Sequence, residues 1–219
     1  MTEQLTEEEQ VEALKKWWKE NGTAIIVGIV IGISTIVGFW KWNEYTETRA
    51  LEASAMYDKF ITEVTDKNGD VKTVYDTLKK DYEDTSYAAL AALRMASTAY
   101  GNNENQKAIE HLTWAVEHPG HDSILHIARI RLTKILVAEN KLDEAEKYLK
   151  DVKEPAFDAE YAVIRGDIYS KRGNVEQART SYQSALDSNS FSGKQRDYIQ
   201  MKMDNLGVVG LSATAGEAK

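Results

Sequence analysis

Four histidines gather in one short part of the chain, and imidazole is a side chain that binds transition metals and transfers protons near neutral pH. They surround a proline, and they are His111, His118, His121 and His126. Their spacing fits no standard zinc pattern, and the chain has no cysteine that could complete such a site. We therefore interpret these histidines as solvated turn residues, and we expect no metal and no other cofactor.

Sequence motifs of known catalytic chemistry are also absent from the chain. It contains no Gly-x-x-x-x-Gly-Lys-[Ser/Thr] loop for phosphates, no Gly-x-Gly-x-x-Gly for dinucleotides, no His-Glu-x-x-His and no Gly-x-Ser-x-Gly. No candidate nucleophile stands in a known spacing from a base, and the lack of cysteine excludes thiolate catalysis and disulfides. We predict that the protein is not an enzyme.

The composition indicates a helical chain that does not bind nucleic acid. Only two prolines occur in 219 residues, 42% of the residues are hydrophobic and 28% are charged. Such a chain is long enough for one sizeable core and favours helices over strands. The net charge is −8 and no run of lysine or arginine is present, so a phosphate backbone would find little attraction.

Residues 23–40, TAIIVGIVIGISTIVGFW, contain no charged side chain, and as a helix they would be about 27 Å long. This length is close to the hydrocarbon core of a bilayer, and tryptophans flank the stretch at Trp17, Trp18, Trp40 and Trp42. A buried core helix is the alternative, but soluble helices seldom lack charge for about five turns. We predict a transmembrane helix at residues 23–42, preceded by a tail, residues 1–22, that carries a short amphipathic helix.

A cleaved signal peptide is a second alternative, because lysines precede the stretch and Ala53-Ser54-Ala55 resembles a cleavage site. That triplet lies too far downstream, and the apolar run is longer than that of a signal peptide. We therefore predict an uncleaved signal anchor. Charge only weakly favours a cytoplasmic N-terminus, since three basic residues lie near each end of the stretch: Lys15, Lys16 and Lys19, and Lys41, Arg49 and Lys59.

Small residues recur every four positions inside the predicted span, at Ala24, Gly28 and Gly32. Membrane helices approach each other closely where small residues share one face. We predict that another transmembrane helix packs on this stripe. The alternative is that glycine is simply frequent in membrane helices.

The rest of the chain keeps the helical spacing of apolar residues and contains an internal repeat. Ala108, Ala145 and Ala178 follow turns and are separated by 37 and 33 residues, and Val74 continues this phase in a degenerate first hairpin. The period is therefore near 34 residues, as in tetratricopeptide repeats. Residues 159–186 match the spacing of that repeat at six positions: Gly166, Tyr169, Gly173, Ala178, Tyr182 and Ala185.

After the last repeat, residues 193–206 have the pattern of one more amphipathic helix, which we expect to end at Gly207 and to cover the end of the stack. The predicted fold class is all-α. One N-terminal transmembrane helix precedes a tetratricopeptide-like solenoid of helical hairpins, residues 43–211, with a C-terminal capping helix. Residues 212–219 are predicted to be a disordered tail.

In this repeat class the first helix of each hairpin lines the concave side of the stack. The repeat phase places ten residues there as candidates for partner binding: Leu90, Leu93, Tyr100, Ile127, Ile130, Lys134, Val137, Glu160, Val163 and Asp167. Residues 124–138 are apolar around most of a helix, so a second face must also be covered. Either a partner peptide or helix fills this groove, or neighbouring repeats and the capping helix cover it.

Three segments mark a resemblance to one bacterial family. They are the approach to the membrane, EEEQVEALKKWWKENG, the segment that follows the span, WKWNEYTETRALEASAMYDKF, and the ending IQMKMDNL. With the repeats between them, the chain closely resembles the ancillary subunits of the Sec translocon, which are tetratricopeptide-repeat proteins of the bacterial inner membrane. The similarity covers nearly the whole chain.

This resemblance implies a single-pass inner-membrane protein of type II, with its N-terminus in the cytoplasm and its domain in the periplasm. It implies association with the SecYEG channel and with a membrane-anchored periplasmic chaperone of the prolyl-isomerase class, and a role in assisting translocated polypeptides. Some members of the family are linked to control of an envelope stress response. A membrane-anchored scaffold for another envelope assembly or stress-signalling complex is the alternative function.

Overall fold

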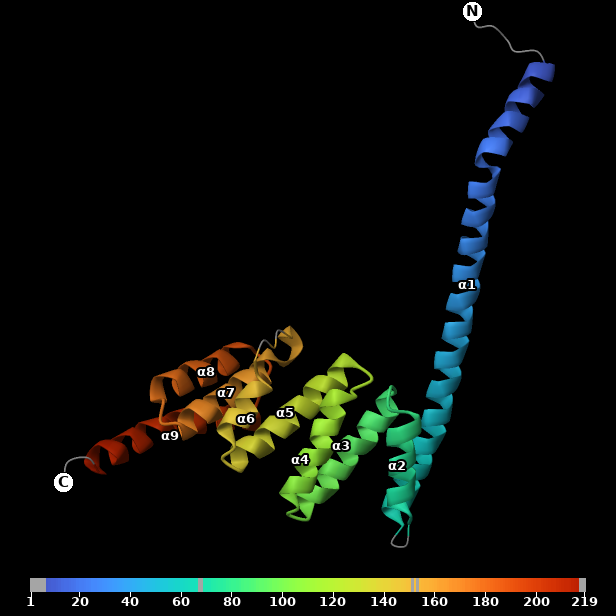
Figure 1. Ribbon diagram of the computed structural model, residues 1–219. Coiled ribbons are helices and arrows are strands. Elements are labelled where there is room, and N and C mark those ends of the chain that lie inside the picture. The colour runs from blue at the N-terminus through green and yellow to red at the C-terminus, as the bar shows by residue number, and fades with distance from the viewer. Residues whose placement is uncertain (1–6, 67–68, 151, 153, 217–219) are drawn as a thin grey trace, which may run out of the picture. The chain divides into compact units, whose positions relative to one another are not determined.

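The computed structural model describes residues 7–66, 69–150, 152 and 154–216, with side chains as far as Leu206. Every regular element within these residues is a helix (Figure 1). The chain divides into two compact units, residues 1–52 and residues 53–219. The prediction of an all-α fold is confirmed.

The first helix, α1, runs without a break from Glu7 to Thr65 and contributes to both units. It is long and apolar enough to cross a membrane. Most of its apolar side chains in the first unit are exposed, for example 55% for Ile29, 60% for Ile31 and 63% for Phe39. Because nothing within the first unit covers them, these side chains need another apolar environment, such as lipid or a partner helix.

The approach to the span belongs to α1 and is not a separate short helix, which corrects the sequence prediction. The side-chain amide of Asn21 donates to the carbonyl of Trp17, 3.0 Å away, and an added Cβ on Gly22 would stand 3.0 Å from the Trp18 ring. A glycine costs a helix only about 1 kcal/mol relative to alanine. The Asn-Gly pair therefore continues the helix and does not form a turn.

The second unit is built from helical hairpins in the order that the repeat predicts (Figure 1). The last turns of α1 pack against α2, where the ring centroids of Phe60 and Tyr75 lie 6.2 Å apart. Three hairpins and a final helix follow. The bounds are α2 Val71–Asp81, α3 Ser86–Gly101, α4 Asn105–Glu117, α5 Asp122–Ala138, α6 Leu142–Lys147, α7 Asp158–Lys171, α8 Val175–Asp187 and α9 Lys194–Gly216.

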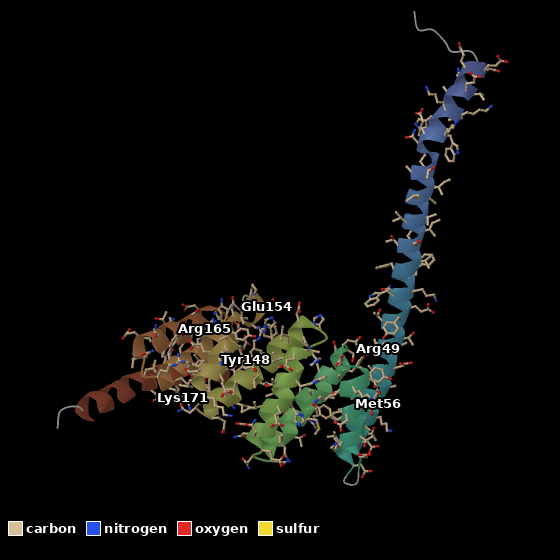
Figure 2. The ribbon with its side chains drawn as sticks, viewed as in Figure 1. Arg49, Met56, Tyr148, Glu154, Arg165 and Lys171 are labelled. Atoms are coloured by element: carbon tan, nitrogen blue, oxygen red, sulfur yellow. The ribbon has the colours of Figure 1, made fainter. Side chains whose placement is uncertain are left out.

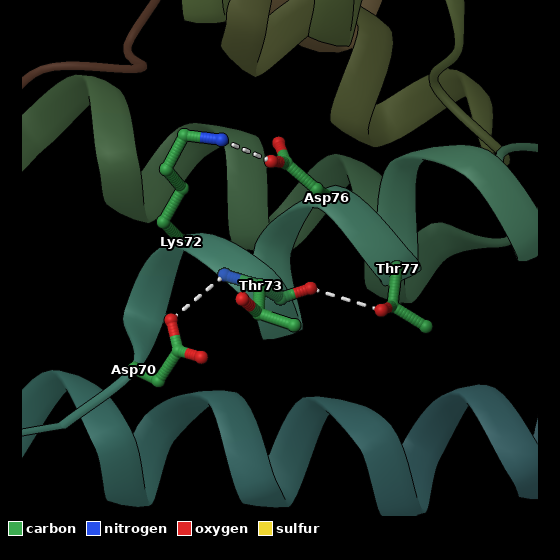
Figure 3. A network of polar contacts seen from close by, with 5 residues as sticks. All are labelled: Asp70, Lys72, Thr73, Asp76 and Thr77. Carbon is green, nitrogen blue, oxygen red and sulfur yellow. Dashed lines mark hydrogen bonds and ion pairs between the residues drawn. The ribbon is translucent and has the colours of Figure 1, made fainter.

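Local polar contacts start α2 at the place where the degenerate first hairpin turns. The amide of Thr73 donates to Asp70 Oδ1 at 3.2 Å, Lys72 Nζ lies 2.7 Å from Asp76 Oδ2, and the Thr77 hydroxyl donates to the Thr73 carbonyl at 2.9 Å (Figure 3). The hydrogen bonds from Thr73 hold the pKa of Asp70 below its usual range. Asp70 is thus the N-cap of α2.

The backbone of the turns repeats with the predicted period. Each of the three later hairpins turns through one residue with positive φ: Asn103 at 62°, Asn140 at 60° and Gly173 at 77°. Each of these stands five residues before a fully buried alanine, and these alanines are Ala108, Ala145 and Ala178. Asparagine adopts the left-handed conformation more readily than most residues, so it can take the place of glycine in the two earlier hairpins.

The second helix of the α5–α6 hairpin is short. α6 has 6 residues, whereas α4 and α8 have 13 each. Amide hydrogen bonds from Tyr148 and Leu149 to carbonyls three residues earlier tighten its end. The chain then enters α7 through one turn of 3-10 helix, η1, at Pro155–Phe157.

Two apolar clusters form the core of the second unit. The larger extends from Phe60 in α1 to Ile168 in α7, and the smaller joins α7, α8 and α9. In the smaller cluster an added Cβ on Gly166 would stand 2.4 Å from the Tyr182 ring. The close approach of α7 and α8 depends on this glycine, as the repeat predicts.

The capping helix, α9, covers the end of the stack through Ile199 and Leu206, which are 3% and 2% exposed. Its predicted end at Gly207 is wrong, because α9 continues to Gly216. A glycine ends a helix only when it adopts the left-handed conformation. Gly207 lies within α9 and therefore does not end it. The backbone of residues 212–216 is therefore helical where a disordered tail is predicted, and residues 217–219 lie outside the described residues.

Candidate partner-binding groove

A cleft of about 640 Å³ opens between α5, α7 and α9. We call it the larger cleft. The walls come from the first helices of two hairpins and from the capping helix, which contributes Tyr198, Ile199 and Lys202. Five of the ten residues predicted for partner binding line it: Lys134, Val137, Glu160, Val163 and Asp167. The capping helix thus forms a wall of the groove and leaves this space open.

A smaller cleft of about 340 Å³ opens between α3, α4 and α5. Leu93 and Tyr100, both predicted for partner binding, line it together with Arg131. Lys134 lines the smaller and the larger cleft alike, so the two lie on either side of this one side chain. We refer to the two clefts together as the groove.

Three of the predicted residues do not line the groove. Ile130 is 8% exposed and belongs to the larger core cluster, and Leu90 and Ile127 pack against that cluster. The apolar circumference of α5 is explained in the same way, because α5 packs against α4 on one side and α6 and α7 on the other. The surface of the groove is consequently more polar than the sequence suggests.

Asp167 is the best-connected polar residue of the larger cleft. Lys202 Nζ from α9 donates to its two carboxylate oxygens at 2.6 and 2.8 Å, and the Tyr182 hydroxyl from α8 donates to Oδ1 at 2.7 Å. Burial, and then the Asp167 carboxylate, raises the pKa of Tyr182, so its hydroxyl remains a donor. Asp167 therefore ties α8 and α9 to α7.

The other charges of the groove lack such partners. Within the described residues, Arg131, Lys134 and Lys171 make no ion pair, and the Oε2 atom of Glu160 is buried without a hydrogen bond. Lys171 is the last residue of α7 (Figure 2). Four cations and two carboxylates line the groove in total. This local excess of positive charge contrasts with the net charge of −8 of the whole chain.

The four histidines do not act together. Among the residues that the structure describes, no group of three or more potential ligands could hold a metal ion. The interpretation as solvated turn residues is wrong for His126, which is 8% exposed, stacks on Phe157 and hydrogen-bonds the Tyr161 hydroxyl at 2.8 Å. It is also wrong for the half-buried His111, which lies within α4.

His111 hydrogen-bonds Tyr75 in the same way, with Nδ1 3.0 Å from the hydroxyl oxygen. Tyr75 and His111 stand 36 residues apart, and His126 and Tyr161 stand 35 apart. Lys202 and Asp167 are likewise separated by 35. These polar pairs connect helices one repeat apart, and a search for histidine–tyrosine pairs at the repeat period could have found two of them in the sequence.

The small-residue stripe of the first unit lies on an uncovered helix surface. A Cβ added at Gly28 or Gly32 would meet nothing within 4 Å, and Ala24 is exposed. A bulkier side chain would therefore cause no clash within this unit. The contact of the stripe with a partner helix stays a prediction.

Comparison with known proteins agrees with this architecture. The family described as "Tetratricopeptide repeat-like domain" matches residues 15–208. A protein of Haemophilus influenzae named "Ancillary SecYEG translocon subunit" is 30% identical over 206 residues, which cover 94% of this chain and all of the relative. A protein of Escherichia coli with the same name is 28% identical over 202 residues, 92% of this chain and 97% of the relative. No solved structure matches the chain. The chain therefore belongs to the tetratricopeptide repeat-like family of ancillary SecYEG translocon subunits.

Proposed function

We propose that this protein is a non-catalytic subunit of the SecYEG translocon that is anchored in the bacterial inner membrane by α1. The observation that carries this proposal is the extent of the match to relatives named for that complex. It covers at least 97% of the length of the two relatives above, so it includes α1 as well as the repeats.

The proposed orientation has the N-terminus in the cytoplasm and the repeats in the periplasm. There the groove would bind protein partners, namely a membrane-anchored chaperone of the prolyl-isomerase class and polypeptides leaving the channel. The two clefts on either side of Lys134 support this role, because stacked helical hairpins commonly bind partners through such extended concave surfaces.

Purification of the full-length protein from membranes in mild detergent tests the association. The protein should retain SecY, SecE and SecG in stoichiometric amounts, and a photo-crosslinking residue in place of Lys134 should capture the chaperone or a translocating chain. The same crosslinker at Lys80, an exposed position on α2 outside the groove, is the control. Purification free of SecYEG, together with another envelope complex, would favour the scaffold function instead.

A further inference from the structure

The groove carries cations where its two clefts meet and an exposed tyrosine in each cleft, and the larger cleft also holds the charges of Glu160, Asp167, Lys171 and Lys202. Arg131 and Lys134 stand three residues apart on α5, so their Cβ atoms lie about 5–6 Å apart on one face. Both side chains are exposed. Tyr100 in the smaller cleft is 52% exposed, and Tyr198 in the larger cleft is 54% exposed. A ligand that crosses Lys134 would therefore meet cations at the middle and aromatic side chains on both sides.

Three of the four cations of the groove, Arg131, Lys134 and Lys171, form no ion pair within the described residues, as is also true of Lys80 and Arg179 elsewhere in the second unit, whereas Lys202 pairs with Asp167. Lys72 pairs with Asp76, Lys107 with Glu104, and Arg172 with two carboxylates. Acidic residues outnumber basic ones in this chain, 35 to 27, so carboxylates are plentiful. Within the described residues, nevertheless, none forms an ion pair with Arg131, Lys134 or Lys171. These cations are therefore available to a ligand of opposite charge.

Building on the proposed function, we propose that the groove binds an internal polypeptide segment of a partner protein in which acidic side chains stand between apolar ones. The acidic side chains meet Arg131 and Lys134, and the apolar side chains enter the two clefts. Since Lys134 lines both clefts, the ligand passes across it, which suits an internal segment better than a chain end.

Peptide binding to the full-length protein in nanodiscs of neutral lipid tests this inference. Two fluorescent peptides of about ten residues, about 33 Å when extended, have amidated ends and alternate leucine with either glutamate or glutamine. We expect the glutamate peptide to bind about tenfold more tightly at low salt, with a difference that shrinks as salt is raised. Equal affinities at all salt concentrations, or no binding of either peptide, would overturn the inference.

Charge-reversal variants test whether the preference for the glutamate peptide depends on the cations of the groove. Lys134→Glu should remove or reverse the preference for glutamate, and Arg131→Glu, also at an exposed position, should do the same if Lys134→Glu fails to fold. Lys80→Glu makes the same charge change on α2, outside the groove, and should keep the preference. If Lys80→Glu loses the preference for glutamate to the same extent, the preference depends on the net charge of the protein and not on the groove, and the inference is overturned.

Three further measurements separate this inference from its rivals. Binding that requires a free C-terminal carboxylate on the peptide would show that the groove binds chain ends and not internal acidic segments. An effect of Lys134→Glu on binding that appears only in nanodiscs with anionic lipid would show that the lysine binds lipid and not the peptide. Co-purification with SecYEG is measured on the same wild-type protein. If the protein retains SecYEG but binds the two peptides equally, only this inference is wrong. If the protein does not retain SecYEG, the proposed function is wrong.

Discussion

At Gly166 the α7–α8 hairpin has no room for a side chain, because the Tyr182 ring lies 2.4 Å from the position of an added Cβ. The ring cannot move easily, since it is buried and its hydroxyl binds Asp167. We expect Gly166→Ala to lower the free energy of unfolding by about 1–2 kcal/mol, because overpacking outweighs the gain in helix propensity. Thermal unfolding of the full-length protein in detergent, followed by circular dichroism, should show a Tm lower by a few degrees.

Gly101→Ala is the matched control for this substitution. Gly101 is the last residue of α3, and a Cβ added there would meet nothing within 4 Å. The same change of residue should leave the stability unchanged or raise it by up to about 1 kcal/mol. Equal losses in the two variants would contradict the role of the Tyr182 contact.

The half-buried His111 makes stability depend on pH. Burial, and then the charges of Lys79 and Lys107, lowers its pKa, and Glu110 opposes this shift. The fold therefore favours the neutral imidazole, which hydrogen-bonds the hydroxyl of Tyr75. Because the folded pKa lies below the unfolded value of 6.5, this contribution to stability is complete above that pH and is lost as the pH falls toward the folded pKa.

We expect the Tm of the wild-type protein to fall between about pH 7 and about pH 5, and His111→Gln to reduce this slope. Glutamine can still hydrogen-bond Tyr75, but it does not titrate in this range. Melting curves of both proteins across the range provide the comparison. Identical slopes would show that other groups account for the pH dependence.

At the scale of elements, the pair of Lys202 and Asp167 fixes α9 against α7. The two side chains are only 22% and 20% exposed, so their interaction is less screened than that of a surface pair. We expect Lys202→Ala to destabilise the docking of α9 by about 1–2 kcal/mol. Hydrogen exchange of the full-length protein should then show lower protection at residues 199–206 than in the wild type.

The control is Lys72→Ala on α2. Lys72 Nζ lies close to Asp76 Oδ2 (Figure 3), at 2.7 Å, but the two side chains are 87% and 55% exposed. Removal of this exposed pair should change the stability only slightly, because water screens the interaction of the two charges. If Lys202→Ala has no larger effect than Lys72→Ala, burial does not strengthen the pair on α9.

The sequence predicts the repeat well, because a few small residues determine how two helices pack. Ala108, Ala145 and Ala178 mark the hairpins, and all three are fully buried. The short α6 could not be predicted in this way, since no glycine or proline separates Leu142 from Pro155. Its end depends on Leu149, which enters the core and is 7% exposed. Contacts between distant residues therefore decide where this helix ends.

The groove was harder to predict than the helices. Seven of the ten residues chosen by repeat phase line the clefts, because the phase correctly places the first helix of each hairpin. Ile127 and Ile130 pack in the core instead, since neighbouring helices cover α5 on two sides. The match to the repeat motif ends at residue 186, so it assigns neither Tyr198 nor Lys202, although Lys202 stands one repeat period after Asp167.

At the scale of the whole molecule, the proposed orientation can be tested with single cysteines, because the chain has none of its own. Lys80→Cys lies on the exposed surface of the second unit, and Lys15→Cys lies before the span. In cells with a permeable outer membrane, a membrane-impermeant maleimide should label Lys80→Cys at once and Lys15→Cys only after lysis. The reverse pattern would mean that the repeats face the cytoplasm.

Variants of the stripe of Ala24, Gly28 and Gly32 test whether the proposed span contributes to partner binding independently of the repeats. Membrane helices associate through close packing, since lipid provides no hydrophobic driving force between them. The double variant Gly28→Leu and Gly32→Leu keeps the span apolar and meets no side chain of its own unit. We expect normal insertion into the membrane and a several-fold lower yield of SecYEG or of the chaperone in co-purification.

Gly38→Leu is the control for this variant. Gly38 also has nothing within 4 Å of an added Cβ, but it lies about 80–120° around the helix from Gly28 and Gly32. The same increase in bulk on that side should leave co-purification unchanged. If the double variant retains its partners while Lys134→Glu loses them, association depends on the repeats and the glycine stripe does not contribute. Losses in both variants would instead mean that the span and the groove bind together, so that each binding event raises the effective concentration of the other.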